Sequence, residues 1–203
     1  MNSIILSGSV NQLTRSMTFS SLMIEGKVQF DRNCVENRRD NVDRIAIALL
    51  YSSHRGEILK LGDGVIFSNN CVLGVDNRSA RGGVLLNSSI SPITIGDHAV
   101  FSGNYAFSNL NGAFGGVFYS ARHRSVGMGF HGEIAVGANA TFINNYAFSN
   151  STTASGGVIC SSGDISFSDG ATFINNYAKT SGGAIELAGK LDLLALTKDV
   201  LFS

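Results

Sequence analysis

The sequence predicts an all-β fold, a parallel β-helix (solenoid) of about five coils with uncapped ends. Two short motifs alternate four times along the chain, and short segments between them alternate polar with apolar residues. Glycine is abundant, with 24 of 203 residues, while proline occurs once. Repeats of 31 to 41 residues that hold only short strand segments cannot bury a core alone, so neighbouring copies are expected to stack.

The first motif is Phe-x-x-Asn, whose two side chains would lie on opposite faces of a regular strand. Both point inward only if the backbone turns between them, and asparagine tolerates the left-handed conformation that such a corner needs. Stacked coils would align the asparagines in a hydrogen-bonded ladder and the rings in a column. The clear copies are Phe67 with Asn70, Phe101 with Asn104, Phe142 with Asn145 and Phe173 with Asn176, and a weaker copy is Phe30 with Asn33.

The second motif is Gly-Gly followed by a small and then a large apolar residue. The glycines permit a sharp corner without a Cβ clash, and the large residue is expected to point into the core. The glycine pairs are Gly82 and Gly83, Gly115 and Gly116, Gly156 and Gly157, and Gly182 and Gly183. The outward neighbours of the large residues, predicted to face solvent, are Leu86, Tyr119, Cys160 and Glu186.

A looser third element precedes most Phe-x-x-Asn copies. Residues 92–95, 133–136 and 164–167 alternate polar with apolar side chains, as in a half-buried strand, and residues 56–61 fit after a one-residue slip. Each repeat is therefore expected to hold three short strands separated by turns rich in Gly, Asn, Asp and Ser.

The whole chain, 1–203, reads as one β-helix fragment. Residues 1–55 are expected to form degenerate coils, 56–188 the clear repeats, and 189–203 the start of a truncated repeat, because Phe202 begins another copy of the first motif. Residues 4–9 are similar to the tail of a Gly-Gly strand. Neither end supplies a polar capping coil, so we expect exposed strand edges and self-association.

Composition excludes several classes of protein. Basic and acidic residues number 15 each, so there is no net positive field to attract nucleic acid. No apolar stretch approaches the roughly 20 residues of a transmembrane segment, and the N-terminus lacks the basic region of a signal peptide.

Nothing in the sequence predicts catalysis, a cofactor or a metal site. Four aspartates beside turn glycines are ordinary turn residues, and the four histidines share no metal-ligand spacing. Residues 31–44 interrupt the repeat as a degenerate coil or a solvated loop. Residues 121–132 form a basic segment that either contacts an anionic glycan or is a tolerated insertion. The aspartates are Asp63, Asp97, Asp164 and Asp169, and the histidines are His54, His98, His123 and His131.

The alternating motif pair resembles the passenger region of the chlamydial polymorphic membrane proteins, over residues 67–187 and, weakly, 26–34. The resemblance implies a right-handed, single-stranded parallel β-helix that an autotransporter route carries to the outer membrane surface. It also implies a non-enzymatic adhesin whose partner is an unidentified receptor or glycan on host cells. Members of the family carry a signal peptide and an outer-membrane barrel, and this sequence shows neither. Two alternatives stay open: a carbohydrate-active β-helix enzyme, and a non-functional, truncated remnant of a longer surface protein.

The cysteines give a sharper expectation. Cys34 and Cys71 directly follow the motif asparagine, where the later repeats have Tyr105, Tyr146 and Tyr177. Equivalent positions in adjacent coils lie one strand spacing apart, about 4.8 Å, which a disulfide accepts. We therefore predict that Cys34 and Cys71 stack and can form a disulfide, leaving Cys160 for an intermolecular link.

Overall fold

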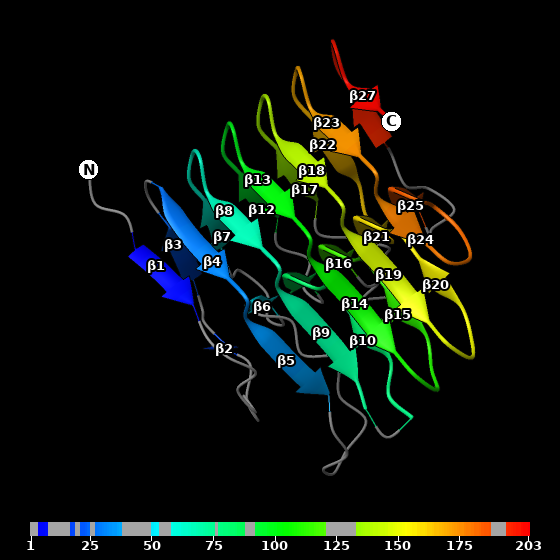
Figure 1. Cartoon of the computed structure of the whole chain (residues 1–203). Coiled ribbons are helices and arrows are strands. Elements are labelled where there is room, and N and C mark those ends of the chain that lie inside the picture. The colour runs from blue at the N-terminus through cyan, green and yellow to red at the C-terminus, as the bar shows by residue number, and fades with distance from the viewer. Residues whose placement is uncertain are drawn as a thin grey trace, which may run out of the picture.

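The predicted parallel β-helix is confirmed by a computed structural model. It describes residues 4–7, 17–18, 21–24, 27–37, 50–52, 58–75, 77–87, 92–120, 133–187 and 194–203. In these ranges the regular elements are all β-strands, and the sheets run side by side along one stack (Figure 1). The first strand, β1 (Ile4–Ser7), and the last, β27 (Leu201–Phe202), lie at opposite ends of that stack.

Five parallel sheets, named A to E here, make up the described stack. Sheet C holds β3 (Ser21–Ile24), β7 (Ile58–Leu61), β12 (Ile93–Ile95), β17 (Ile134–Val136), β22 (Ile165–Phe167) and β26 (Leu194–Leu196). Sheet A holds β1, β4 (Val28–Asp31), β8 (Ile66–Ser68), β13 (Val100–Ser102), β18 (Thr141–Ile143), β23 (Thr172–Ile174) and β27. Sheet D holds β5 (Cys34–Asn37), β9 (Cys71–Gly74), β14 (Tyr105–Ser108), β19 (Tyr146–Ser149) and β24 (Tyr177–Ala178). Sheet E holds β10 (Ala80–Arg81), β15 (Ala113–Phe114) and β20 (Ala154–Ser155). Sheet B holds β2 (Met17–Thr18), β6 (Leu50–Ser52), β11 (Leu85–Asn87), β16 (Phe118–Ser120), β21 (Ile159–Ser161) and β25 (Ile185–Leu187).

A coil visits the sheets in the order C, A, D, E, B, as β12 to β16 do. The expected three strands per repeat were therefore wrong, because the strands of sheets D and E were missed. In β14, Tyr105 and Phe107 point outward while Ala106 and Ser108 are buried. This alternation places the large apolar residues outside, so the usual expectation of apolar-inward strands does not reveal it.

Two hydrophobic clusters fill the interior. The larger one lies between sheets A, B and C and contains the phenylalanine column with branched aliphatic residues. The smaller one is almost entirely alanine, with Ala106 of sheet D and Ala113 of sheet E among its members. Because alanine side chains are short, sheets D and E can approach closely, and they form a thin lobe beside the wide core.

The corner between sheets A and D uses the left-handed backbone conformation that the first motif predicts. The residue with positive φ comes directly before the motif asparagine, for example Asn69 (φ 55°) before Asn70 and Gly103 (φ 63°) before Asn104. In the weak first copy this position is Arg32, also with φ 54°. The third residue of the motif therefore makes the turn, while the fourth sends its side chain into the core.

The ends of the described stack confirm one expectation and correct another. Phe30 pairs with Phe67 and Phe202 with Phe173, so the weak first copy and the partial last copy both belong to the repeat. Residues 4–9 were expected to continue a Gly-Gly strand, but β1 lies in sheet A, with Leu6 opposite Phe30. A leucine thus occupies the register position that phenylalanine takes in later coils, so the sequence motif cannot be recognised there.

Candidate functional site

The motif phenylalanines are core residues. Their rings form a continuous column, with centroid separations of 4.6 Å from Phe30 to Phe67, 5.4 Å from Phe67 to Phe101 and 5.0 Å from Phe101 to Phe142. The column goes on through Phe173 to Phe202, with separations of 4.8 Å and 4.6 Å. Because Phe67, Phe101, Phe142 and Phe173 are at most 1 % exposed, they cannot touch a partner while the chain is folded.

The motif asparagines form the predicted ladder. The Nδ2 of each donates to the Oδ1 of the next, at 3.0 Å in every step from Asn33 through Asn70, Asn104 and Asn145 to Asn176. Each Nδ2 from Asn70 onward also donates to the main-chain oxygen of a motif phenylalanine in the preceding coil. The ladder therefore ties neighbouring coils together inside the protein.

The Gly-Gly pairs form the corner between sheets E and B. The first glycine of each pair adopts positive φ, between 59° at Gly182 and 66° at Gly82 and Gly156. In the first three pairs a Cβ on the second glycine would overlap main-chain oxygens, those of Gly157 and Tyr146 in the case of Gly116. All sixteen predicted motif residues thus have structural positions, and most of the surface that could bind a partner is made of other residues.

Sheet D presents a band of aromatic residues on its outer face. We call this band, made of Leu73, Tyr105, Phe107, Tyr146, Phe148 and Tyr177, the aromatic strip. The rings of Tyr105 and Tyr146 stack at 4.7 Å, those of Phe107 and Phe148 at 6.1 Å, and Tyr177 is 50 % exposed. Burial raises the pKa of Tyr146, and the neighbouring Tyr105 adds to that rise.

Sequence reasoning noted the tyrosines only as counterparts of the two cysteines. A stronger signal was available, because the hexapeptide Asn-Tyr-Ala-Phe-Ser-Asn occurs twice, at 104–109 and 145–150. Its small residues line the thin lobe and its aromatic residues face outward. Lys179 lies at the C-terminal end of the strip, with its Nζ 5.5 Å from the centre of the Phe148 ring.

The two cysteines begin the same outward column, and their predicted stacking is confirmed. Cys34 and Cys71 are register partners in sheet D, their Cα atoms lie 4.5 Å apart, and their sulfur atoms are joined in a disulfide. Cys160 is free, but it is only 4 % exposed. The expected intermolecular link through Cys160 is therefore not open to the folded chain.

The turn aspartates serve the backbone. Asp63 accepts a hydrogen bond from the main-chain N–H of Asp97, and Asp97 accepts one from Ala138. Asp169 accepts from Lys198 in the same way. These contacts fit their prediction as turn residues, and within the described ranges no group of three or more His, Cys, Asp or Glu could hold a metal ion. His98 lies in such a turn, with φ 56°, whereas His54, His123, His131 and the basic segment 121–132 lie outside the described residues.

Four outward residues of sheet B were expected to be exposed to solvent. This expectation was wrong for two of them, since Leu86 is 1 % and Cys160 4 % exposed. The Gly-Gly turn brings the outer faces of sheets E and B together. The Cζ of Arg81, in sheet E, lies 5.3 Å from the centroid of the Tyr119 ring. The centroid of the Phe114 ring lies 6.0 Å from that of Tyr119. We call Arg81, Leu86, Phe114, Tyr119 and Cys160 the E–B corner.

The E–B corner is poorly hydrated. Burial raises the pKa of the Cys160 thiol to about 12, with a further contribution from the negative charge of Glu186. Burial also raises the pKa of Tyr119, while the charge of Arg81 acts in the opposite direction on both groups.

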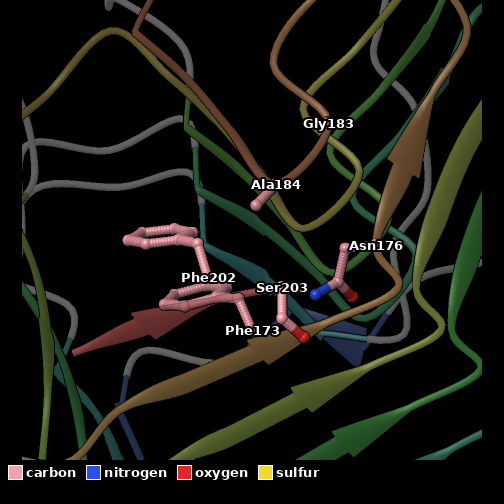
Figure 2. Close-up of a pocket in the computed structure, with 6 residues that line it drawn as sticks. All are labelled: Phe173, Asn176, Gly183, Ala184, Phe202 and Ser203. Atoms are coloured by element: carbon pink, nitrogen blue, oxygen red, sulfur yellow. The ribbon is translucent and has the colours of Figure 1, made fainter. Parts of the chain in front are cut away.

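A cavity of about 310 Å³ opens at the C-terminal end of the stack (Figure 2). The rings of Phe173 and Phe202 lie next to each other, Ala184 and Gly183 lie above them in this view, and the side chains of Ser203 and Asn176 lie to their right. These residues continue the phenylalanine column and the asparagine ladder. The cavity is thus the open end of the coil interior.

Comparison with protein-family models, with curated proteins and with solved structures finds no match for this chain. Within the described residues there is also no helix long and apolar enough to cross a bilayer. The resemblance to the chlamydial polymorphic membrane proteins consequently rests on the alternating motifs, and the surfaces described above are the basis for a functional proposal.

Proposed function

We propose that this chain is a non-enzymatic adhesion module, displayed at the outer membrane surface and binding host cells through the aromatic strip. The observation that carries the proposal is that tyrosine and phenylalanine side chains stand together on the outside of a regular sheet. Tyrosine combines a large apolar ring with a polar hydroxyl, which is why it is enriched at protein-binding surfaces.

The geometry of the strip suits recognition by a flat partner. Because the Tyr105 and Tyr146 rings are parallel within 2° and stacked on each other, they direct their edges rather than their faces to solvent. Stacking also restricts the rotamers of both side chains, so little conformational entropy remains to be lost on binding. The strip is therefore a preorganised surface that offers apolar ring edges and hydroxyl groups.

The disulfide between Cys34 and Cys71 supports the surface location. Disulfides persist in oxidising environments and are rare where thiols are kept reduced. A disulfide in register with the aromatic strip is consistent with a module that matures outside the cytoplasm.

The test is binding of the labelled chain to cultured epithelial cells. Threonine replaces Tyr105, Tyr146 and Tyr177 together, since threonine keeps β-propensity on an outward strand position. The matched control replaces Ile143 and Ile174, which are half-buried on the outer face of sheet A, by threonine. We expect at least a tenfold loss of binding for the tyrosine variant only.

Two results would contradict the proposal in different ways. If the tyrosine variant keeps its unfolding midpoint and binds cells like the wild type, the aromatic strip is not the adhesive surface. If the wild-type chain binds no host cells at all, the adhesive function itself is wrong.

A further inference from the structure

The E–B corner contains a charged side chain with one unused, buried hydrogen-bond donor. The Nε of Arg81 is buried and has no hydrogen-bond partner. Its guanidinium stacks on Tyr119 and forms no ion pair within the described part of the chain, although Glu186 lies in the same outward column, two register steps beyond Tyr119. A buried N–H without an acceptor is unfavourable, and a partly exposed guanidinium that pairs with no carboxylate of the described chain leaves its outer N–H groups open to an anion.

The surroundings of Arg81 restrict the kind of anion. The guanidinium offers several N–H donors in a planar fork that matches a carboxylate. The rings of Phe114 and Tyr119 lie beside it and provide apolar surface at the same place. A ligand that carries a carboxylate next to a face of C–H groups would satisfy both features, and an acidic sugar has this chemistry.

We infer that the E–B corner binds an acidic saccharide, with the sugar carboxylate on Arg81 and the sugar ring against Phe114 and Tyr119. This site is separate from the aromatic strip, because the strip lies on sheet D and Arg81 on sheet E, the two walls of the thin lobe. The inference rests on the proposed adhesive function for its biological role, to which it gives a ligand class.

The experiment is a calorimetric titration of the full chain at physiological salt. The probes are a hyaluronan hexasaccharide and sialyllactose, which carry a uronic and a sialic carboxylate. Their neutral counterparts are the carboxyl-reduced hexasaccharide and lactose. We expect at least one acidic probe to bind, and its neutral counterpart to bind at least tenfold more weakly, because the Arg81 contact needs the charge.

Three variants locate the site. Arg81→Gln removes the charge and Arg81→Lys keeps it but removes the fork, so both should weaken binding at least tenfold. Arg32→Gln is the control, because it removes the same charge from a side chain that is 76 % exposed and pairs with Asp31 at 3.3 Å. This control should bind like the wild type.

The inference is overturned if neither acidic probe binds, if acidic and neutral probes bind equally, or if Arg81→Gln and Arg81→Lys both bind like the wild type while folded. Equal weakening by Arg32→Gln would show nonspecific charge attraction and overturn it too. The proposed adhesive function is judged separately by the tyrosine variant on cells. If the Arg81→Gln variant still binds host cells, the proposed adhesive function holds, and the acidic saccharide is not the ligand through which it acts.

Discussion

At the scale of single residues, one amide of the asparagine ladder serves several buried groups. The Oδ1 of Asn145 accepts from the main-chain N–H and the Nδ2 of Asn104. Its Nδ2 donates to Asn176 and to the main-chain oxygen of Phe101. Asparagine is suited to this position because it carries one acceptor and two donors on a short side chain.

The first prediction concerns these motif residues. Asn145→Ala leaves buried donors and an acceptor unpaired and should destabilise the fold by about 1–3 kcal/mol. Phe142→Ala opens the centre of the ring column and should cost about 3–5 kcal/mol. Urea unfolding measures the free energy of unfolding of both variants. Asn150→Ala, at an exposed position, is the control and should change that free energy little. Loss of cell binding by both motif variants with unchanged unfolding midpoints would make them contact residues instead.

Cys160 predicts how the stability of the fold depends on pH. The folded-state pKa of its thiol is raised to about 12 because the thiol is buried, whereas the thiol of the unfolded chain titrates near 9. This group therefore stabilises the fold fully below pH 9, and the contribution is lost as the pH rises from about 9 toward 12.

The measurement is the unfolding midpoint of the wild type and of Cys160→Ala at pH 8 and pH 10.5. The wild type should lose more stability than the variant between these values. The other ionisable groups are common to both proteins and cancel in the comparison. Equal losses would show that the buried thiol does not titrate as described.

At the scale of elements, the Gly-Gly corner decides how closely two coils approach. The second glycine faces the main chain of the next coil, so that a Cβ on Gly116 has no room between the oxygens of Gly157 and Tyr146. In the last copy the corresponding Gly183 would meet only the Asn176 oxygen, at 3.6 Å. The same motif position is therefore sterically closed where another Gly-Gly corner follows and open in the last corner of the described stack.

This difference gives a matched pair of variants. Gly116→Ala should destabilise the fold by at least about 3 kcal/mol, because main-chain atoms on two sides must move. Gly183→Ala should stay within about 1 kcal/mol of the wild type, because ordinary van der Waals contact is all that it adds. Thermal and urea unfolding compare them. Similar effects of the two changes would mean that the corner glycines are needed for backbone conformation alone.

At the scale of the whole molecule, the disulfide ties the N-terminal coils to the regular repeats. Cys34 and Cys71 are 37 residues apart in sequence, and closing a loop of that length should contribute about 3–4 kcal/mol. Adding a reductant should lower the unfolding midpoint of the wild type, while the double variant Cys34→Ser, Cys71→Ser should not respond. A wild type insensitive to reductant would show that the pair does not stabilise the chain.

Association is the second prediction at this scale. The C-terminal end of the described stack exposes Leu196, Leu201 and Phe202, each more than 40 % accessible, together with the edge of β27. Unpaired parallel edges with apolar side chains favour pairing with another chain. The 203-residue chain should therefore form concentration-dependent oligomers in light scattering, and replacing Leu201 and Phe202 by lysine should reduce them. A stable wild-type monomer at high concentration would contradict this prediction.

The sequence by itself determined the stacking of coils and which residues form the inner ladders. Phe-x-x-Asn and Gly-Gly can be recognised in the sequence because the backbone needs the same corner conformation at these positions in every repeat. Motif spacing alone is therefore enough to align Phe67, Asn70 and Cys71 with Phe30, Asn33 and Cys34 of the neighbouring coil. Such one-dimensional periodicity survives in sequence because each coil contacts mainly its neighbours.

Only the tertiary structure decided which outward residues gather into surfaces. The aromatic strip depends on four strands of sheet D, one wall of the alanine-lined lobe. The E–B corner depends on a turn that places Arg81 over Tyr119. The E–B corner has no repeating pattern, since Arg81, Phe114 and Ser155 occupy equivalent positions in successive coils. Stacking repeats the backbone but leaves side chains on the outside free to differ, and those differences become a site only when the corner geometry brings them together.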